Sequence, residues 1–174
     1  MSGYKGETQS KNIAWFLPRP KPDRYKGGMP LYAESWLLSL ASDILGIENP
    51  KILNLFCGMN VQGFRVDIKP DVNPDLVCDI HCLSEYLKDT FDIILCDPPY
   101  SDKESSELYG TPKLNYKKWT SEATKLLSPK GILIVYHKYV MPNPDPEVYV
   151  VERRVFIGNR TYHVPRCAIY FRKK

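Results

Sequence analysis

Residues 91–100 carry the sequence FDIILCDPPY, and this stretch decides how the rest of the chain is interpreted. Its first six residues form an apolar run with the length and composition of a buried strand. Asp97 and Pro98 are both expected to be extended, because the residue before a proline is disfavoured in the helical region. Neither proline has an N–H group, so the backbone here offers carbonyl oxygens without competing donors. The sequence predicts a stiff corner that combines a carboxylate, backbone acceptors and the flat ring of Tyr100.

This corner has two interpretations. Its acceptors and flat face suit a planar group that carries an NH2, such as the exocyclic amine of a nucleobase. The structural alternative is a strand that ends at prolines and exposes a solvated aspartate. The elements that surround the corner favour the first interpretation.

Strands and helices alternate along the chain. Short apolar runs predict strands at residues 51–56, 64–68, 76–80, 92–97, 132–136, 148–157 and 161–171. Helical spacing of apolar residues predicts helices at 31–45, 83–87 and 116–127. We expect the first helix to end at Gly46, a polar loop at 101–111, a turn at 128–131 and a hairpin turn at Gly158-Asn159.

In this order, the elements of residues 48–140 resemble the class I S-adenosylmethionine-dependent methyltransferases. The Asp-Pro-Pro-Tyr corner is the most specific part of the likeness. It narrows the resemblance to amino-methyltransferases of nucleic-acid bases, such as DNA adenine-N6 methylases. The resemblance implies an α/β fold with a doubly wound, mostly parallel seven-stranded sheet and an antiparallel final hairpin. Strands 51–56 and 92–97 would be adjacent at its centre, where ligands bind at the carboxyl ends of the strands.

The chain departs from the family pattern after the first of these strands. The family has two or three glycines there, whereas this chain has Cys57-Gly58-Met59-Asn60. Asn60 is expected to replace a later glycine, because asparagine tolerates the left-handed conformation. Residues 57–63 are also too few for a full crossover helix, which normally needs a dozen or more residues. The prolines of 141–146 likewise shorten the last crossover.

The resemblance implies where S-adenosylmethionine binds. Asp67, at the end of the second strand, matches the acid that binds the ribose hydroxyls, and Asp79 matches the residue that meets the adenine amino group. Ile68 and Ile80 would enclose the adenine ring. A lone aspartate at a strand end is more often a cap or turn residue, but here two occur in the order that the family requires. The cofactor residues implied by the resemblance are Asn54, Phe56, Cys57, Gly58, Asp67, Ile68, Asp79 and Ile80.

Asp97, Pro98, Pro99 and Tyr100 are the expected catalytic residues. The exocyclic amine of adenine is a poor nucleophile, because its lone pair is delocalised into the ring. Hydrogen bonds to the Asp97 carboxylate and the Pro98 carbonyl would favour a pyramidal nitrogen, so that positioning and preorganised dipoles supply the catalysis. Tyr100 would stack on a base that is flipped out or single-stranded. Carbon-5 methylation of cytosine would instead need a thiol nucleophile within this turn. Cys96 lies one residue before the motif, so we do not expect that reaction.

We therefore expect an S-adenosylmethionine-dependent N-methyltransferase, with N6 of adenine in DNA as the favoured target. Cytosine N4 and guanine N2 in RNA remain open. A non-catalytic methyltransferase-like subunit that binds RNA or a partner is an alternative. Another is methylation of a protein glutamine, for which the motif usually begins with Asn. With no room for a separate target-recognition domain, sequence choice would come from loops, a partner subunit or the shape of an RNA.

The 174 residues suffice for one domain, which we predict at 31–174 after an irregular extension at 1–30. Residues 25–28 are a candidate flap, and a surface arm is the alternative. Net charge is +4 at 1–30, −6 at 31–150 and +6 at 151–174, which favours either a polyanionic partner or solubilising termini. We expect a cytoplasmic protein with reduced cysteines, without a membrane span or signal peptide. Cys78, His81 and Cys82 are a weak metal-site alternative to no metal.

Overall fold

The computed structural model describes residues 12–17, 29–30, 32–107, 110, 113–158 and 164–174. The strands are β1 (Asn12–Phe16), β2 (Ile52–Leu55), β3 (Phe64–Asp67), β4 (Leu76–Val77), β5 (Phe91–Cys96), β6 (Leu127–His137), β7 (Tyr149–Gly158) and β8 (Arg166–Lys173). The helices are α1 (Ala33–Leu45), α2 (Leu83–Tyr86), α3 (Asp102–Glu107) and α4 (Tyr116–Leu126), with short 3₁₀ helices η1 (Pro70–Val72) and η2 (Ile80–Cys82). No helix in these described ranges is long and apolar enough to cross a membrane.

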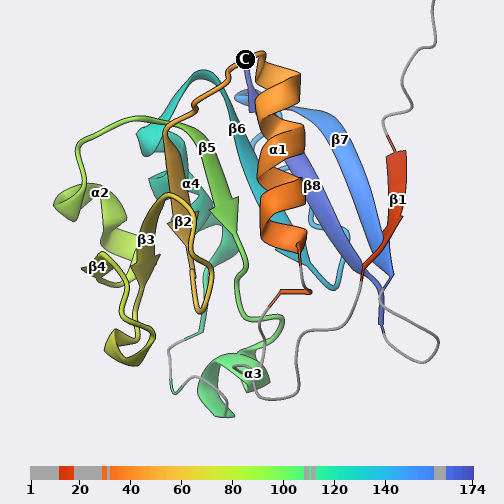
Figure 1. Ribbon diagram of the computed structural model, residues 1–174. Helices are drawn as coiled ribbons and strands as arrows, with labels where there is room; N and C mark the ends of the chain where they lie inside the picture. Colours follow the sequence, from red (N-terminus) through yellow and green to blue (C-terminus); the bar gives the residue numbers. More distant parts are fainter. Residues whose placement is uncertain (1–11, 18–28, 31, 108–109, 111–112, 159–163) are drawn as a thin grey trace, which may run out of the picture.

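The strands form a single sheet in the order β1-β7-β8-β6-β5-β2-β3-β4 (Figure 1). Strands β4, β3, β2, β5 and β6 are parallel, and β8 runs antiparallel to both β6 and β7. Strands β2 and β5 are neighbours, as the sequence predicted for its first and fourth strands. The prediction of a doubly wound, mostly parallel sheet with an antiparallel final hairpin is therefore confirmed.

The sheet has eight strands instead of seven because β1 pairs in parallel with β7. The expectation of an irregular segment at 1–30 is wrong for Asn12–Phe16. The prolines on which that expectation rested all lie outside these five residues, which are free to extend. Ile13 and Trp15 face the core, while Phe16 is 85% exposed. The candidate flap at 25–28 lies outside the described residues.

Two predicted connections differ from the structure. The polar loop expected at 101–111 contains helix α3, whose six residues include neither Gly nor Pro and of which Ser105 is buried. The turn expected at 128–131 is instead an irregular part of β6. Its pairing with β5 shifts register between Phe91 and Ile93, and Lys130 has a φ of 61°. The second difference arises because pairing with β5 extends β6 through its local turn signals.

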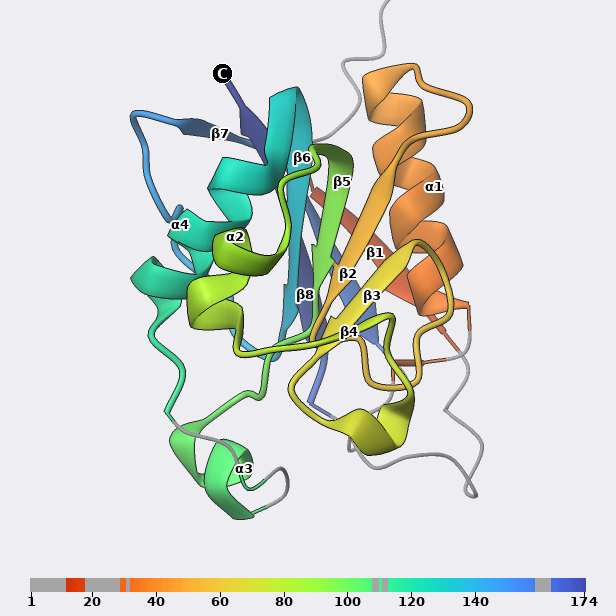
Figure 2. The ribbon, with the colours of Figure 1, turned by 90° about the vertical axis from the view of Figure 1, so that its left-hand side faces the viewer.

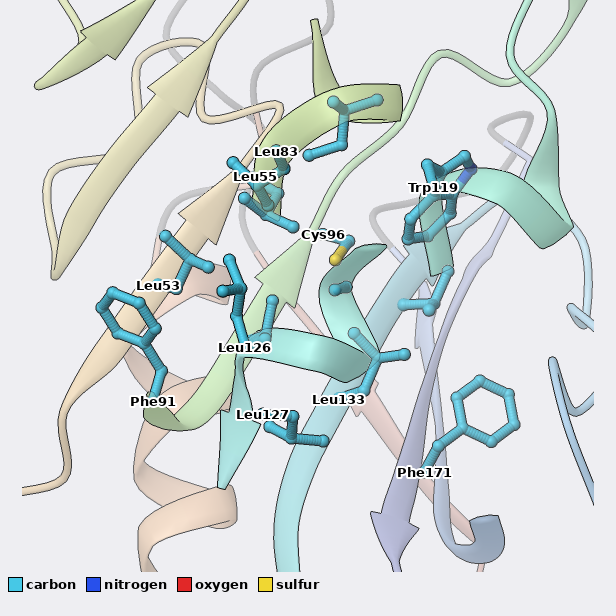
Figure 3. Close-up of a cluster of buried hydrophobic side chains, with 14 of the residues drawn as sticks. Leu53, Leu55, Leu83, Phe91, Cys96, Trp119, Leu126, Leu127, Leu133 and Phe171 are labelled. Atoms are coloured by element: carbon cyan, nitrogen blue, oxygen red, sulfur yellow. The ribbon is translucent and has the colours of Figure 1, made fainter. Parts of the chain in front are cut away.

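Helices cover the two faces of the sheet unequally. Figure 2 shows α1 on one face and α2 with α4 on the other. Helix α1 buries Leu37, Leu38 and Ala41 against β5, β6, β7 and β8, and it ends at Gly46, whose φ is 67°. On the opposite face, Trp119 and Leu126 of α4 pack on the other side of the same central strands (Figure 3). Strand β5 is therefore buried on both faces, which explains its continuous apolar sequence.

The first and last crossovers are short, as the sequence predicted. No helix lies between β2 and β3 or between β6 and β7 in the described residues of these connections. Gly63 makes the first connection possible because its φ is 75°. A Cβ atom at this position would also lie 2.6 Å from the carbonyl oxygen of Ile52. The tight return places the end of β2 directly beside the end of β3.

Candidate active site

The candidate site lies at the carboxyl ends of the three central parallel strands. Leu55, the last residue of β2, is in register with Val66 of β3 on one side and with Cys96 of β5 on the other. The residues that follow these two partners are Asp67 and Asp97. The two aspartates therefore flank the bend that follows β2, as expected for the carboxyl edge of a doubly wound sheet.

Asp67 organises this bend. One of its carboxylate oxygens accepts the Gly58 N–H at 2.9 Å, and the other accepts the Lys69 N–H at 3.0 Å. Phe56 and Gly58 both have positive φ, at 55° and 48°. The expected left-handed residue, Asn60, does not have a positive φ, so that prediction is wrong. Each Asp67 oxygen keeps a further lone pair, which leaves the carboxylate able to accept from two hydroxyl groups.

A small pocket opens beside Asp67. It is lined by Phe56, Val66, Asp67, Ile68, Cys78, Asp79, Ile80, His81 and Leu114. Five of the eight residues predicted to bind the cofactor, namely Phe56, Asp67, Ile68, Asp79 and Ile80, are thus brought together. The pocket volume is about 30 Å³. Ile80 is buried in its wall, and Ile68 is 39% exposed at the mouth.

His81 orients the second aspartate of this pocket. The Asp79 carboxylate accepts the His81 backbone N–H at 2.9 Å, and its Oδ1 lies 2.8 Å from His81 Nδ1. The other ring nitrogen, Nε2, accepts the Asn115 N–H at 3.0 Å. Since Nε2 is an acceptor, the neutral ring carries its proton on Nδ1 and donates it to Asp79. Asn115 caps α4 by accepting the Lys118 N–H, so His81 ties the pocket to the start of that helix.

The remaining three predicted cofactor residues do not line the pocket. Gly58 belongs to the bend, and burial raises the pKa of the Cys57 thiol to about 12. Asn54 is fully buried and donates through Nδ2 to the Glu34 carboxylate at 2.9 Å. These positions contribute to the scaffold of the site, and their contact with a cofactor stays a prediction.

Glu34 is a site residue that the sequence did not reveal. Its carboxylate accepts the Val61 N–H at 3.0 Å and the Gln62 N–H at 2.9 Å, in addition to the Asn54 amide. It therefore fixes the second half of the β2–β3 connection to the first turn of α1. An acidic residue in a first helical turn normally needs no partner beyond the helix itself, so nothing in the sequence distinguished Glu34.

The Asp-Pro-Pro-Tyr corner follows β5 directly. The Asp97 N–H donates to the Leu55 carbonyl at 3.4 Å, which continues the sheet pairing for one residue. The Tyr100 hydroxyl lies 3.3 Å from Asp97 Oδ1 and donates to it. Burial raises the pKa of Tyr100 far above its ordinary value, and the Asp97 charge raises it further, so the phenol stays protonated. Pro98 is buried and Pro99 half-buried.

Charged and aromatic groups surround the Tyr100 ring. The His137 ring meets it edge-on at a centroid separation of 5.0 Å. The Arg166 guanidinium lies over the ring at 4.7 Å, and Lys138 Nζ lies 5.8 Å from the ring centre. The ring face expected to stack on a base is therefore in contact with Arg166 in this structure. The stacking role of Tyr100 stays a prediction.

Cys96 cannot act as a nucleophile in this geometry. It is fully buried, and burial raises the pKa of its thiol well above the ordinary value, with a smaller contribution from the Asp97 charge. Only a thiolate is an effective nucleophile. The burial of the Cys96 thiol therefore argues against carbon-5 methylation more strongly than its position in the sequence does.

Comparisons with known proteins place this geometry in context. No family model matches the chain. The ribosomal RNA large subunit methyltransferase I of Photobacterium profundum is 30% identical over 64% of this chain. Among solved structures, TrmN from Thermus thermophilus has a TM-score of 0.61 at 17% identity over 86% of this chain. N-methyltransferase NodS from Bradyrhizobium japonicum WM9, in complex with S-adenosyl-L-homocysteine, has a TM-score of 0.55 at 15% identity over 80% of this chain.

These likenesses confirm the predicted Rossmann-like methyltransferase fold. The chain spans 28% of the length of the ribosomal RNA methyltransferase, 50% of the TrmN chain and 84% of the NodS chain. What the two solved structures share with this chain is the fold.

Proposed function

We propose that this chain is an S-adenosylmethionine-dependent methyltransferase that acts on an exocyclic amino nitrogen of a nucleic-acid base. The observation that carries the proposal is the Asp97–Tyr100 corner at the carboxyl end of β5, beside the bend that Asp67 holds. N6 of adenine in DNA is the favoured target. Ribosomal RNA is the second, because the curated relative is a ribosomal RNA methyltransferase.

The side chains around the pocket fit the cofactor. The Asp67 carboxylate keeps lone pairs for two ribose hydroxyls, and Asp79, oriented by His81, has an oxygen for an adenine amino group. Ile68 and Ile80 supply apolar walls for a flat ring. When bound, S-adenosylmethionine supplies an electrophilic methyl group on its sulfonium.

The corner supplies the acceptors that a weak amine nucleophile needs. The Asp97 carboxylate and the Pro98 carbonyl accept the two N–H groups of the amine, which turns its lone pair away from the base ring. The Tyr100 hydroxyl, donating to Asp97 Oδ1, holds the carboxylate in one orientation. Such preorganised acceptors lower the barrier without a covalent enzyme intermediate.

The alternatives from the sequence are less well supported. The non-catalytic subunit is favoured by the unusual Cys57–Asn60 sequence and by the shortened crossover between β2 and β3. Against it, Asp67 closes that bend through the Gly58 N–H and a pocket forms beside it. Methylation of a protein glutamine remains disfavoured because the motif begins with Asp97. A target-recognition partner subunit and a cytoplasmic location are also part of the proposal.

The test is methyl transfer from labelled S-adenosylmethionine to DNA, ribosomal RNA and transfer RNA. We expect label in one pool, and a loss of at least about 100-fold in rate for Asp97→Ala, the size seen when one preorganised transition-state contact is removed. The matched control is Asp89→Ala, an exposed aspartate before the amino end of β5. It is expected to retain the wild-type rate.

Calorimetry with the cofactor separates the outcomes. Asp97→Ala is expected to bind S-adenosylmethionine with nearly wild-type affinity, because Asp67 and Asp79 are unchanged. Label that persists in Asp97→Ala would refute the catalytic role. A wild-type chain that binds no cofactor would refute the enzyme.

A further inference from the structure

The edge of the site beyond Tyr100 carries a second group of residues. We call Lys138, Tyr139 and Arg166 the flanking cluster. Lys138 and Tyr139 directly follow the last residue of β6, and Arg166 is the first residue of β8. Because β8 is antiparallel to β6, and His137 is in register with Cys167, the end of one strand meets the start of the other. The cluster therefore lies at the same sheet edge as the Asp97–Tyr100 corner, because β5 is parallel to β6 and Cys96 is in register with Val135.

The two cations of the cluster are held close to aromatic rings. Lys138 Nζ lies 5.2 Å from the centre of the Tyr139 ring and 5.8 Å from that of Tyr100. The Arg166 guanidinium lies over Tyr100 and donates through Nη1 to the Val164 carbonyl at 2.7 Å. These contacts fix both positive charges beside the catalytic corner.

Tyr139 presents an aromatic ring to solvent at this edge. Its side chain is 60% exposed, and the neighbouring Val140 and Val164 are 56% and 62% exposed. Its backbone N–H donates to His137 Nδ1 at 3.0 Å, and the two rings lie 5.4 Å apart. His137 itself is only 5% exposed. A buried histidine thus holds the backbone of an exposed tyrosine.

We propose that the flanking cluster binds the nucleotide next to the target base in a single-stranded or locally unpaired polynucleotide. The ring of Tyr139 stacks on that neighbouring base, while Lys138 and Arg166 contact its phosphodiester. This inference rests on the proposed function, because it takes the target amine to lie at Asp97. An exposed aromatic ring with cations beside it is the combination by which proteins bind single strands without a sequence preference.

An unpaired strand fits this edge better than an intact duplex. The target amine must reach Asp97, which is half-buried at the end of β5, so the base has to leave any stack. The neighbouring base then loses the target base as a stacking partner, and the Tyr139 ring takes the place of the target base. Stacking of one base on an aromatic side chain contributes roughly 5- to 100-fold in affinity.

Binding is measured by fluorescence anisotropy with the full chain and labelled 12-mers. The probes are a single-stranded DNA, its RNA counterpart and the DNA duplex, each in a salt series with S-adenosylhomocysteine present. We expect the wild type to bind a single strand more tightly than the duplex. Comparison of the single-stranded DNA with its RNA counterpart then decides which of the two polynucleotides is the ligand. Tyr139→Ala should weaken that binding about 5- to 100-fold, whereas Tyr139→Phe should stay within about twofold of the wild type.

The cations are tested by the salt dependence. Lys138→Ala should reduce the slope of log affinity against log salt by about 0.7, the value for one phosphate contact on a single strand. The matched control is Lys174→Ala, which removes the same charge at the far end of β8, where Nζ binds the Pro146 carbonyl. It should leave the slope unchanged. Arg166→Lys keeps the charge but loses the planar group, and should weaken binding at every salt concentration.

The outcomes separate this inference from the proposed function. All variants should keep the wild-type affinity for S-adenosylmethionine by calorimetry, since none contacts the pocket. If Tyr139→Ala and Lys138→Ala bind single strands as Lys174→Ala does, the flanking cluster is not the subsite, even where methyl transfer proceeds. If the wild type prefers the duplex, the inference is also overturned. Failure of the proposed function would appear instead as absent cofactor binding or absent label.

Discussion

Asp67 performs two tasks with one carboxylate. It accepts the Gly58 and Lys69 N–H groups, and so fixes the bend after β2 against the end of β3. In the proposed function it also binds the ribose hydroxyls of the cofactor. Both tasks need two acceptor oxygens, which an amide does not have.

We predict that Asp67→Asn weakens cofactor binding about 10- to 100-fold. The substitution replaces one acceptor by an NH2 group, which faces a backbone N–H, and removes charge-assisted hydrogen bonds that each contribute roughly 1.5–3 kcal/mol. Titration calorimetry with S-adenosylmethionine measures the effect. The control is Asp71→Asn, an exposed aspartate in η1. Equal affinity in both variants would contradict the role of Asp67.

Single residues were predictable where their chemistry follows from a strand end. Asp67 is the last residue of β3, Asp97 directly follows β5, and Asp79 lies two residues after β4, so the parallel topology brings all three to one edge. The observed role of Glu34 was missed, and His81 was named only as a weak metal-ligand candidate, because their partners Val61 and Asn115 lie 27 and 34 positions away in sequence. Lys138 and Tyr139 were missed although they follow a predicted parallel strand, a position that would have indicated them.

Among the elements, the β2–β3 connection is the one that shapes the site. It replaces a crossover helix by eight residues with no helix among them, and Glu34 of α1 clamps its second half. Its last residue, Gly63, combines a φ of 75° with close contact to Ile52. The element depends on glycine both for its backbone angle and for space.

We predict that Gly63→Ala destabilises the protein more than Gly46→Ala, measured as the free energy of unfolding in urea. Both glycines have similar positive φ, so each substitution costs about 1–2 kcal/mol in backbone strain. Nothing lies within 4 Å of a Cβ atom at Gly46, whereas one at Gly63 would lie 2.6 Å from the Ile52 carbonyl oxygen. Crowding should add about 1–3 kcal/mol at Gly63. Equal losses would show that the connection relaxes.

Most elements were predictable because local pattern and tertiary setting agree. Helices α1 and α4 have one apolar face, and residues 93–96 of β5 and 132–136 of β6 are continuously apolar because both faces of the sheet are covered there. Strand β1 was not predictable, since its pairing with β7 is set by a partner at the other end of the chain. Helix α3 was missed because six polar residues carry no apolar periodicity.

At the scale of the whole molecule, α2 and α4 form one layer on a face of the sheet and are joined by polar contacts. Glu122 of α4 makes one of them, because its carboxylate accepts the Ser84 N–H of α2 at 2.9 Å and also pairs with Lys125. Burial alone would raise the pKa of Glu122, but hydrogen bonds from Lys125 and Ser84 lower it below its ordinary value of 4.5. The stability of the layer against acid is therefore linked to this carboxylate.

We predict that Glu122 contributes stability above about pH 4.5 that is lost as the pH falls. Its pKa is lower in the folded chain than in the unfolded chain, so the unfolded chain takes up the proton first and acid favours unfolding. Scanning calorimetry from pH 7 to pH 3 should show a lower Tm for Glu122→Gln at pH 7 and a smaller decrease on acidification. Glu85→Gln, an exposed glutamate on α2, should follow the wild type. Parallel Tm curves for all three proteins would contradict the link.

The parallel pairing of β1 with β7 has a consequence for biosynthesis. As the chain emerges from the ribosome, Asn12–Phe16 are made well before their partners Arg154–Gly158. Strand β1 therefore stays unpaired, with Ile13 and Trp15 uncovered, until the β7–β8 hairpin has been translated. Contacts so distant in sequence form late and slowly. Strand β1 therefore joins the sheet only after β7 has been translated, and until then its uncovered apolar residues are available to a chaperone.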